Sequence, residues 1–259
     1  MSHHIVEVRD LGFVYPGGVE ALRGVSFRVT HGESVALIGA NGAGKSTLLM
    51  HINGSLLPTS GEVRIGDIPL RRETVAAARR AVGMVLQDPD DQLFMPTVLE
   101  DVAFAPLNAG LCGAEAEQCA VAALERVGMA HLKDRPPYRL SAGEKRAVAI
   151  ASALAMEPDI LVMDEPSSHL DPRGRRRLIE MLKPFAHTKI IATHDLELVI
   201  GLCSRVIVLD GGRMVTEGPT ARLLSDAPLM LAHGLEKPLS LRETPRKPYL
   251  IYPHSTSLL

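Results

Sequence analysis

The stretch Gly39-Ala40-Asn41-Gly42-Ala43-Gly44-Lys45-Ser46-Thr47 decides the fold of this chain. It follows the apolar run 35–38 and leads into the helix-like run 48–52. Strand, glycine-rich turn and helix in that order are the setting in which G-x4-G-K-[ST] binds nucleotide phosphates. The glycines let backbone N–H groups approach the phosphates, and the helix N-terminus adds unpaired donors. An ordinary glycine-rich turn does not require the Lys45-Ser46 pair, so the sequence predicts a nucleotide site.

Two side chains of this stretch have specific roles in the predicted site. Lys45 is expected to reach the β- and γ-phosphates of the nucleotide, and the Ser46 hydroxyl is expected to ligate Mg²⁺. The predicted nucleotide contacts of the loop are Gly39, Asn41, Gly42, Ala43, Gly44, Lys45, Ser46 and Thr47.

The size and charge of the chain narrow the classes of function. A chain of 259 residues can bury a full core as one large domain, or as one domain with an inserted lobe. The formal net charge is -2, so no overall field favours nucleic acid or a lipid surface. The one basic run, the arginines within residues 173–177, is typical of a solvated helix face.

Cysteine usage and hydrophobicity indicate the compartment. Cys112, Cys119 and Cys203 are odd in number and lack C-x-x-C spacing, as is typical of free thiols in a reducing cytoplasm. The chain shows no signal peptide and no apolar run approaching about 18 residues, so it is not expected to span a membrane. His3 and His4 are too few to bind a metal ion well.

Apolar runs alternate with helix-period segments through most of the chain. The predicted strands are 5–9, 25–29, 35–38, 62–65, 82–86, 160–163, 189–193 and 206–209. Besides the helix that follows the phosphate loop, the predicted helices outside residues 88–158 are 73–81, 178–182 and 196–202. Alternation of this kind predicts a parallel sheet covered on both faces. Residues 11–18 are predicted to form a loop that carries Tyr15.

A helical region interrupts this alternation between residues 88 and 158. Apolar residues recur there at three- and four-residue spacing within 97–107, 114–127 and 141–156. We interpret this region as an inserted helical lobe. The predicted division is therefore one domain over residues 1–225, followed by a proline-rich appendage at 226–259 whose role the sequence does not reveal.

Polar residues suited to phosphate, metal and water stand where predicted strands end. Asp164 follows strand 160–163 and can hold Mg²⁺, and Glu165 beside it can polarise a water for attack on the γ-phosphate. Gln87 follows strand 82–86, and His194 follows strand 189–193. Taken singly, these positions are also explained by helix capping. Because ligands of parallel α/β sheets bind at the carboxyl ends of strands, their convergence favours a catalytic site.

The stretch 140–146, Leu-Ser-Ala-Gly-Glu-Lys-Arg, opens a predicted helix. Ser141 and Glu144 fit an S-x-x-E capping box. Capping does not require the small residues Ala142 and Gly143, which are expected where a bulky anion approaches the N–H groups of a helix end.

In this order, the motifs resemble those of ATP-binding cassette (ABC) ATPases over residues 5 to about 224. Residues 39–47 are similar to Walker A, Gln87 to the Q-loop, 140–144 to the signature motif, 160–165 to Walker B, 168–171 to the D-loop, His194 to the switch histidine and Tyr15 to the aromatic residue that stacks on adenine. The resemblance implies an α/β fold of the P-loop NTPase class. An ABC nucleotide-binding domain of this kind has a parallel-sheet core, an antiparallel β subdomain and an inserted helical lobe.

The resemblance also implies that two cassettes face each other head to tail, with each ATP between Walker A of one and the signature motif of the other. One chain supplies one of each motif, so a complete site requires a second chain. The second chain is predicted to be another copy of this one, and the alternative is a related subunit. The implied catalytic residues are Lys45, Gln87, Glu165 and His194, the further nucleotide contacts Tyr15 and Asp164, the Mg²⁺ ligands Ser46, Gln87 and Asp164, and the contacts in trans Ser141, Gly143, Glu144 and Asp171.

Three positions depart from the usual family pattern. Ala142 stands where glycine is usual, Glu144 where glutamine is usual, and the D-loop carries the bulkier His169. A second carboxylate near ATP is expected to weaken nucleotide-driven closure modestly. None of these changes removes a catalytic group.

More narrowly, residues 88–94, 96–98 and 100–104 resemble energy-coupling-factor importers, and among these the ATPase subunit of cobalt and nickel uptake systems. The resemblance implies a motor subunit at the cytoplasmic face of the cell membrane that powers cobalt uptake, with nickel or a vitamin as alternative cargoes. Membrane scaffold and substrate-binding subunits are expected to dock between Asp88 and Phe104, where residues 93–95 form an apolar centre with an acidic rim.

Two other classes compete with the transporter. A soluble ABC ATPase acting on DNA is expected to carry long coiled coils, and one acting on the ribosome to carry two cassettes. The chain shows no sustained heptads and one set of motifs, so no nucleic-acid partner is predicted. A P-loop kinase would not explain the stretch 140–144.

Overall fold

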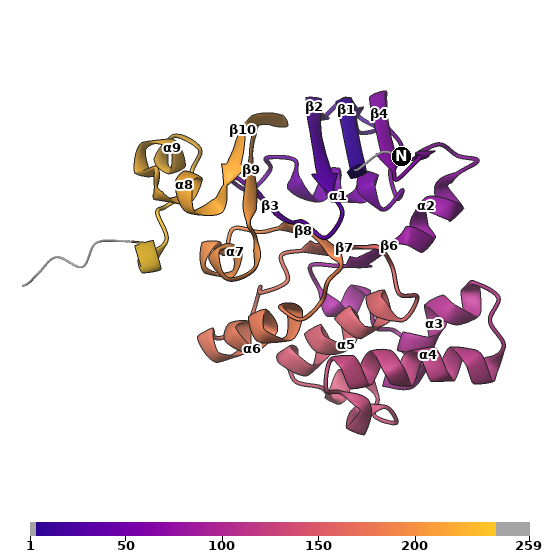
Figure 1. Ribbon diagram of the computed structural model, residues 1–259. Helices are drawn as coiled ribbons and strands as arrows, with labels where there is room; N and C mark the ends of the chain where they lie inside the picture. The colour runs from indigo at the N-terminus through magenta and orange to yellow at the C-terminus, as the bar shows by residue number, and fades with distance from the viewer. Residues whose placement is uncertain (1–3, 242–259) are drawn as a thin grey trace, which may run out of the picture.

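The computed structural model describes residues 4–241, which form two sheets with helices between and around them (Figure 1). The antiparallel sheet, in the order β2-β1-β4-β5, contains β1 (His4–Val14), β2 (Glu20–Thr30), β4 (Ser60–Ile65) and β5 (Ile68–Pro69). The larger sheet, in the order β10-β9-β3-β8-β7-β6, contains β3 (Ser34–Ile38), β6 (Val82–Val85), β7 (Ile160–Asp164), β8 (Thr188–Ala192), β9 (Arg205–Asp210) and β10 (Arg213–Pro219).

The larger sheet is parallel except at one edge. β3 pairs in parallel with β8 and β9, and β7 pairs in parallel with β8 and β6. Among the described strands of this sheet, only β10 runs antiparallel to its neighbour, β9. The carboxyl ends of β3, β6, β7 and β8 therefore lie at one edge. The predicted parallel sheet is confirmed.

Successive residues of the central strands enter different hydrophobic clusters. In β3, Val35 and Leu37 belong to the cluster shared with the antiparallel sheet, whereas Ala36 and Ile38 belong to the cluster shared with the helices. Side chains of a strand point alternately to the two faces of its sheet. A strand covered on both faces must be apolar throughout, which is why these strands read as continuous apolar runs.

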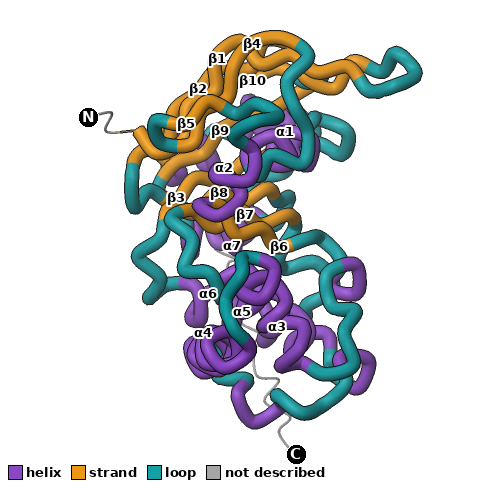
Figure 2. The backbone as a smooth tube through the Cα atoms, turned by 90° about the vertical axis from the view of Figure 1, so that its right-hand side faces the viewer, coloured by secondary structure: helices purple, strands orange, loops and turns teal. Residues whose placement is uncertain are grey.

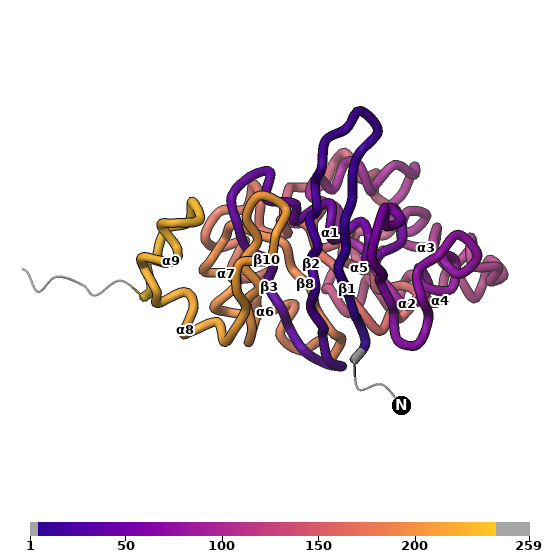
Figure 3. The backbone as a smooth tube through the Cα atoms, turned by 90° about the horizontal axis from the view of Figure 1, so that it is seen from above, coloured from indigo at the N-terminus to yellow at the C-terminus, as the bar shows by residue number. Residues whose placement is uncertain are grey.

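The helices are α1 (Lys45–Ile52), α2 (Val75–Ala81), α3 (Val98–Asn108), α4 (Gly113–Arg126), α5 (Ala142–Leu154), α6 (Pro172–Leu182), α7 (Leu196–Leu202), α8 (Thr220–Ser225) and α9 (Ala227–Ala232). Helix α1 lies between the two sheets (Figure 1). In the view from above, its position coincides with that of β1 and β2 (Figure 3). Helices α3, α4 and α5 pack together on the side of the larger sheet that is remote from the antiparallel sheet (Figure 2). These three helices begin and end within two residues of the predicted helices, counting the capping residues.

Several elements differ from the sequence prediction: β5, α8 and α9 are additional, β2 and α6 begin earlier, and two further strands differ for a clear physical reason. Residues 11–14 were expected in a loop, but β1 continues to Val14 because Leu11 and Phe13 are buried in the core. Strand β10 was not predicted, since its residues are exposed or half-buried and leave no apolar run. A strand at the edge of a sheet needs little buried surface.

The segment after residue 225 begins with α9, whose Met230 is buried in the same hydrophobic cluster as Leu224. Residues 242–259, with most of the prolines of the predicted appendage, and His3 lie outside the described residues. Cys112 is exposed and Cys203 is buried, and both are free thiols. No helix within residues 4–241 has the length and apolar character needed to cross a bilayer.

Candidate functional site

The glycines of the phosphate loop are required by close backbone contacts. A Cβ atom on Gly39 would lie 2.1 Å from the carbonyl oxygen of Leu209, at the end of β9. Gly44 has a φ of 99° and precedes α1 as its N-cap, where it supplies no side-chain acceptor. The first N–H groups of α1 are therefore not capped by that residue and face the cavity that the loop encloses.

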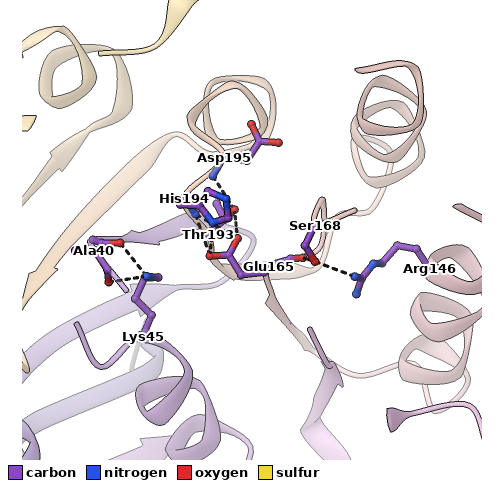
Figure 4. Close-up of polar contacts among 9 residues, drawn as sticks. Ala40, Lys45, Arg146, Glu165, Ser168, Thr193, His194 and Asp195 are labelled. Carbon is purple, nitrogen blue, oxygen red and sulfur yellow. Dashed lines mark hydrogen bonds and ion pairs between the residues drawn. The ribbon is translucent and has the colours of Figure 1, made fainter. Parts of the chain in front are cut away.

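Lys45 is folded over the loop in which it lies. Its Nζ atom donates hydrogen bonds to the carbonyl oxygens of Gly39 (2.8 Å) and Ala40 (3.1 Å), and the residue is 7% exposed (Figure 4). Burial lowers the pKa of the Lys45 ammonium, while the charges of Glu165 and Asp164 act to raise it. A cation in this position is available to phosphate oxygens that enter the loop.

Asp164 ends β7 with an unsatisfied oxygen. The residue is 5% exposed, and its Oδ1 atom is buried without a hydrogen-bond partner among the described residues. Burial raises the pKa of the Asp164 carboxyl, and a hydrogen bond from Ser46 and the charge of Lys45 act to lower it. Asp164, the Ser46 hydroxyl and Gln87 supply oxygen donors, the type that Mg²⁺ prefers. The orphaned carboxylate oxygen therefore fits a Mg²⁺ ion held jointly with a nucleotide.

Glu165 is held by the residues that follow β8 (Figure 4). Its carboxylate accepts hydrogen bonds from the Thr193 hydroxyl (2.9 Å) and from the His194 N–H (3.1 Å). The Nδ1 atom of His194 lies 2.9 Å from Glu165 Oε1. Glu165 itself has a φ of 43°, a left-handed conformation that is uncommon outside glycine and is often found at functional sites.

Asp195 has the structural role that helix capping predicts. It accepts a hydrogen bond from the N–H of Leu198 and forms an ion pair with Arg175 at 3.0 Å. This pair joins the N-terminus of α7 to α6. The His194 ring beside it is two-thirds exposed, so it is free to meet a phosphate group.

A cavity of about 440 Å³ gathers most of the predicted nucleotide contacts. Its lining comprises Tyr15, Val19, Glu20, Ala21, Asn41, Gly42, Ala43, Gly44, Lys45, Ser46, Thr47, Gln87, Glu165 and His194. Gly39 and Asp164 are buried beneath this surface. Val19, which precedes β2, and Glu20 and Ala21, which begin it, could not be recognised from the sequence. Their chemistry gives no signal, and the β1–β2 hairpin brings them to the loop.

Tyr15 lines this cavity and comes directly after β1. Its hydroxyl is 3.1 Å from Thr47 Oγ1, and its ring packs edge-on against Phe13 with ring centroids 4.8 Å apart. The ring is thus held in place by a core side chain while remaining half-buried.

Replacing Tyr15 with alanine is expected to weaken ATP binding by about 1–3 kcal/mol, because stacking on a base contributes about that much. Tyr15→Phe is the matched control, since it keeps the ring and loses only the hydrogen bond to Thr47. Its affinity for ATP, measured by calorimetric titration, should stay close to that of the unchanged protein. Equal losses in the two variants would contradict a stacking role.

The signature residues form the predicted capping box at the start of α5. The Ser141 N–H donates to Glu144 Oε2 (2.8 Å), and the Glu144 N–H donates to Ser141 Oγ (3.4 Å). Hydrogen bonds from Ser141 lower the pKa of the Glu144 carboxyl. Residues 141–143 are exposed, and Asp171 caps α6. Ser141, Gly143, Glu144 and Asp171 are absent from the described lining of the nucleotide cavity, so one chain does not bring the two halves of the predicted site together.

A phosphate loop on a parallel sheet, with polar residues from four strand ends around it, defines a nucleotide-hydrolysing P-loop protein. The family profile described as ABC transporter matches residues 22–168. A provisionally named ABC transporter ATP-binding protein of Geobacter sulfurreducens is 61% identical over 245 residues, 95% of this chain and 98% of that protein. The energy-coupling factor transporter ATP-binding protein EcfA of Methanocaldococcus jannaschii is 45% identical over 240 residues, 91% of this chain and 86% of that protein.

The solved structures agree with the sequence relatives. The protein cbiO1 of Clostridium perfringens, described as part of the ABC transporter complex cbiONQ, matches with a TM-score of 0.77 and 38% identity over 89% of this chain and 94% of that one. This chain belongs to the ABC transporter family. It is an ATP-binding ATPase whose hydrolysis of ATP is coupled to transport.

Proposed function

We propose that this chain is the motor subunit of a membrane importer of the energy-coupling-factor type, located at the cytoplasmic face of the membrane, and that the imported cargo is cobalt ion. Its similarity to EcfA and to cbiO1 supports the type of importer. The structural observation that supports coupling to a partner is a pair of exposed aromatic side chains, Phe94 and Phe104, beside the strand that leads to Gln87.

In the proposed reaction, Glu165 accepts the proton of the attacking water, and His194 and Lys45 stabilise the charge of the transferred phosphoryl group. The hydrogen bonds from Thr193 and His194 fix the direction of the Glu165 carboxylate. Ser46, Asp164 and Gln87 would hold Mg²⁺, which neutralises phosphate charge when it is bound.

A second copy of the chain completes the site in this proposal. The exposed N–H groups at the start of α5, bounded by the small residues Ala142 and Gly143, suit the phosphates of a nucleotide held by the other copy. Asp171 would approach the same site from the D-loop. We therefore propose a homodimer that closes on ATP and opens after hydrolysis.

The docking groove is the cavity of about 360 Å³ between β6, α3 and α5, with Phe94 and Phe104 in its lining. Their rings are 5.1 Å apart in an edge-to-face arrangement, and the residues are 62% and 40% exposed. Paired aromatic side chains left in solvent are typical of protein interfaces. The same groove is lined by Met84 and Leu86, immediately before Gln87, so an occupant would contact the strand that leads to the nucleotide.

The acidic residues near the docking groove have different roles. Asp101 is buried, and its Oδ1 atom accepts hydrogen bonds from the N–H groups of Phe94 and Met95, so it supports the groove instead of forming its rim. Asp90 pairs with Lys145 of α5 at 2.6 Å. Substitution of Phe94 and Phe104 therefore tests docking more specifically than reversal of the acidic charges.

The double substitution Phe94→Ala and Phe104→Ala should abolish co-purification of the chain with its membrane subunits and stop uptake, because the apolar centre of the docking groove is removed. Uptake in cells and capture from detergent-solubilised membranes measure the two effects. The ATPase activity of the isolated subunit should stay within about twofold, since neither ring lines the nucleotide cavity. Leu231→Ala, which removes an exposed apolar side chain on α9, is the control. Normal uptake by the double variant would refute docking at this groove.

The same two measurements, capture and uptake, identify the class of partner and the cargo. Integral membrane proteins in the captured material support the importer, whereas ribosomal RNA or DNA would support a soluble ABC ATPase instead. Uptake of labelled Co²⁺, compared with Ni²⁺ and vitamins in a strain that lacks the chain, decides among the cargoes.

A further inference from the structure

Arg146 connects three segments around the catalytic edge of the sheet. It lies on α5, two residues after Glu144, and its Nη1 atom donates to the carbonyl oxygen of Leu86 at 2.7 Å. Its Nη2 atom donates to the carbonyl oxygen of Gln87 at 2.7 Å and lies 3.4 Å from Ser168 Oγ. The hydroxyl of Ser168 in turn donates to the carbonyl oxygen of Glu165 at 2.8 Å (Figure 4).

The environment of Arg146 is unusual for a side chain that serves stability alone. The residue is 2% exposed, and no carboxylate oxygen within residues 4–241 lies within 4.0 Å of its guanidinium group. Its Nε atom has no hydrogen-bond partner in the same part of the chain. Burial lowers the pKa of the guanidinium, and the charge of Asp88 acts to raise that pKa, but Asp88 forms no ion pair with it. A buried cation whose hydrogen bonds all go to neutral acceptors opposes folding, so its presence calls for another explanation.

The two carbonyl groups that Arg146 binds belong to the backbone from which Gln87 projects. Fixing both peptide planes with one planar guanidinium fixes the direction of the Gln87 side chain in the nucleotide cavity. The branch through Ser168 supports the turn that follows Glu165. One side chain on the signature helix thus sets the backbone at two proposed catalytic positions.

We propose that Arg146 is a positioning residue for ATP hydrolysis. It holds Gln87 and the turn after Glu165 in fixed positions relative to the signature helix α5. The proposal rests on the proposed roles of Gln87 and Glu165. This positioning acts within one chain and needs no contact between Arg146 and the nucleotide.

Two further links tie α5 to the same segment and so to the docking groove. Lys145 pairs with Asp90, and the Gln92 side chain donates to the Ala149 carbonyl oxygen (2.9 Å) and to Ser152 Oγ (2.8 Å). A partner seated in the docking groove would therefore displace α5 and residues 86–92 together. Arg146 is the member of this set that also reaches the turn after Glu165.

The test compares steady-state ATPase kinetics of Arg146→Met and Arg146→Lys with those of the unchanged protein. We expect kcat to fall about 10- to 100-fold in Arg146→Met with KM for ATP changed less than about threefold, because positioning is lost while phosphate contacts remain. Arg146→Lys keeps the charge but cannot bind both carbonyl groups in one plane, so its kcat should be intermediate. If the methionine variant does not fold, the lysine variant decides.

Lys189→Met is the matched control for removal of a buried cation. Lys189 is 5% exposed and donates to the carbonyl oxygens of Phe185 and His187, at the end of β8 that is remote from His194. Its substitution should lower the Tm and leave kcat within about twofold. An equal loss of kcat in this control, or unchanged kcat in both Arg146 variants, would overturn the proposal.

Gln87→Ala separates failure of this inference from failure of the proposed function. If Gln87→Ala lowers kcat while both Arg146 variants keep a normal kcat, the positioning role of Arg146 is excluded and the proposed role of Gln87 stands. A normal kcat in Gln87→Ala would exclude the proposed role of Gln87. It would also exclude the positioning role of Arg146 as proposed, because that role rests on Gln87. A raised KM at unchanged kcat in the Arg146 variants would also overturn the proposal.

Discussion

Glu165→Gln should reduce ATP turnover by about 10²–10⁴-fold, the range that a positioned general base contributes. Glutamine keeps the size of the side chain and can still accept from Thr193 or His194, so the local structure should survive. Nucleotide binding depends on other groups and should persist. The variant should therefore accumulate as an ATP-bound dimer, which light scattering after gel filtration with Mg-ATP can detect.

Glu33→Gln is the control for this experiment. Glu33 is a half-buried carboxylate that pairs with Arg205 at 3.0 Å, away from the nucleotide cavity, so its loss should not slow hydrolysis. Near-normal turnover in Glu165→Gln would exclude Glu165 as the base. Slow turnover without a dimer would instead contradict the proposed closure of two chains on ATP.

Lys45→Ala should weaken ATP binding by about 2–5 kcal/mol, as expected when one partner of a buried charged contact is truncated. Lys45 is 7% exposed, and its ammonium is the cation held over the loop by the Gly39 and Ala40 carbonyl groups. Calorimetric titration with ATP measures the change directly. The loss should exceed that of Tyr15→Ala, because a charge–charge contact is removed instead of a stacked ring.

Lys189→Ala tests whether removal of any buried lysine weakens the nucleotide complex. Its ammonium binds carbonyl groups outside the nucleotide cavity, so ATP affinity should be unchanged. A larger loss in Tyr15→Ala than in Lys45→Ala would contradict the assignment of residues 39–47 as the phosphate loop.

Elements that depend on local pattern were predictable from the sequence. The strand before Gly39 is recognisable because a strand covered on both faces must be apolar, and α5 is recognisable because Ser141 and Glu144 form a capping box. Gly39 was assigned to the loop from its motif, and the structure adds the reason, the approach of the Leu209 carbonyl group. The roles of the site residues remain proposals.

Features that depend on contacts across the chain were not predictable. In the sequence, nothing distinguishes Arg146 from the other charged residues that follow a capping box. Its contacts with Leu86 and Ser168 exist because the fold brings these distant residues together. The pairing of Asp90 with Lys145 joins residues 55 positions apart. Lys189 lies in a strand that is buried throughout, a place where a sequence pattern would not expect a lysine.

The place of β3 in the sheet also affects how the chain can fold during its synthesis. Among the strands within residues 4–241, β3 is hydrogen-bonded only to β8 and β9, whose residues leave the ribosome about 150 positions or more later. At about 5–20 residues per second, this separation amounts to roughly 8–30 s of translation. The neighbouring β1–β2 hairpin needs only microseconds once both of its strands have emerged. For most of its synthesis the nascent protein therefore presents an apolar strand without sheet partners, and prematurely terminated chains should require chaperones to remain unaggregated.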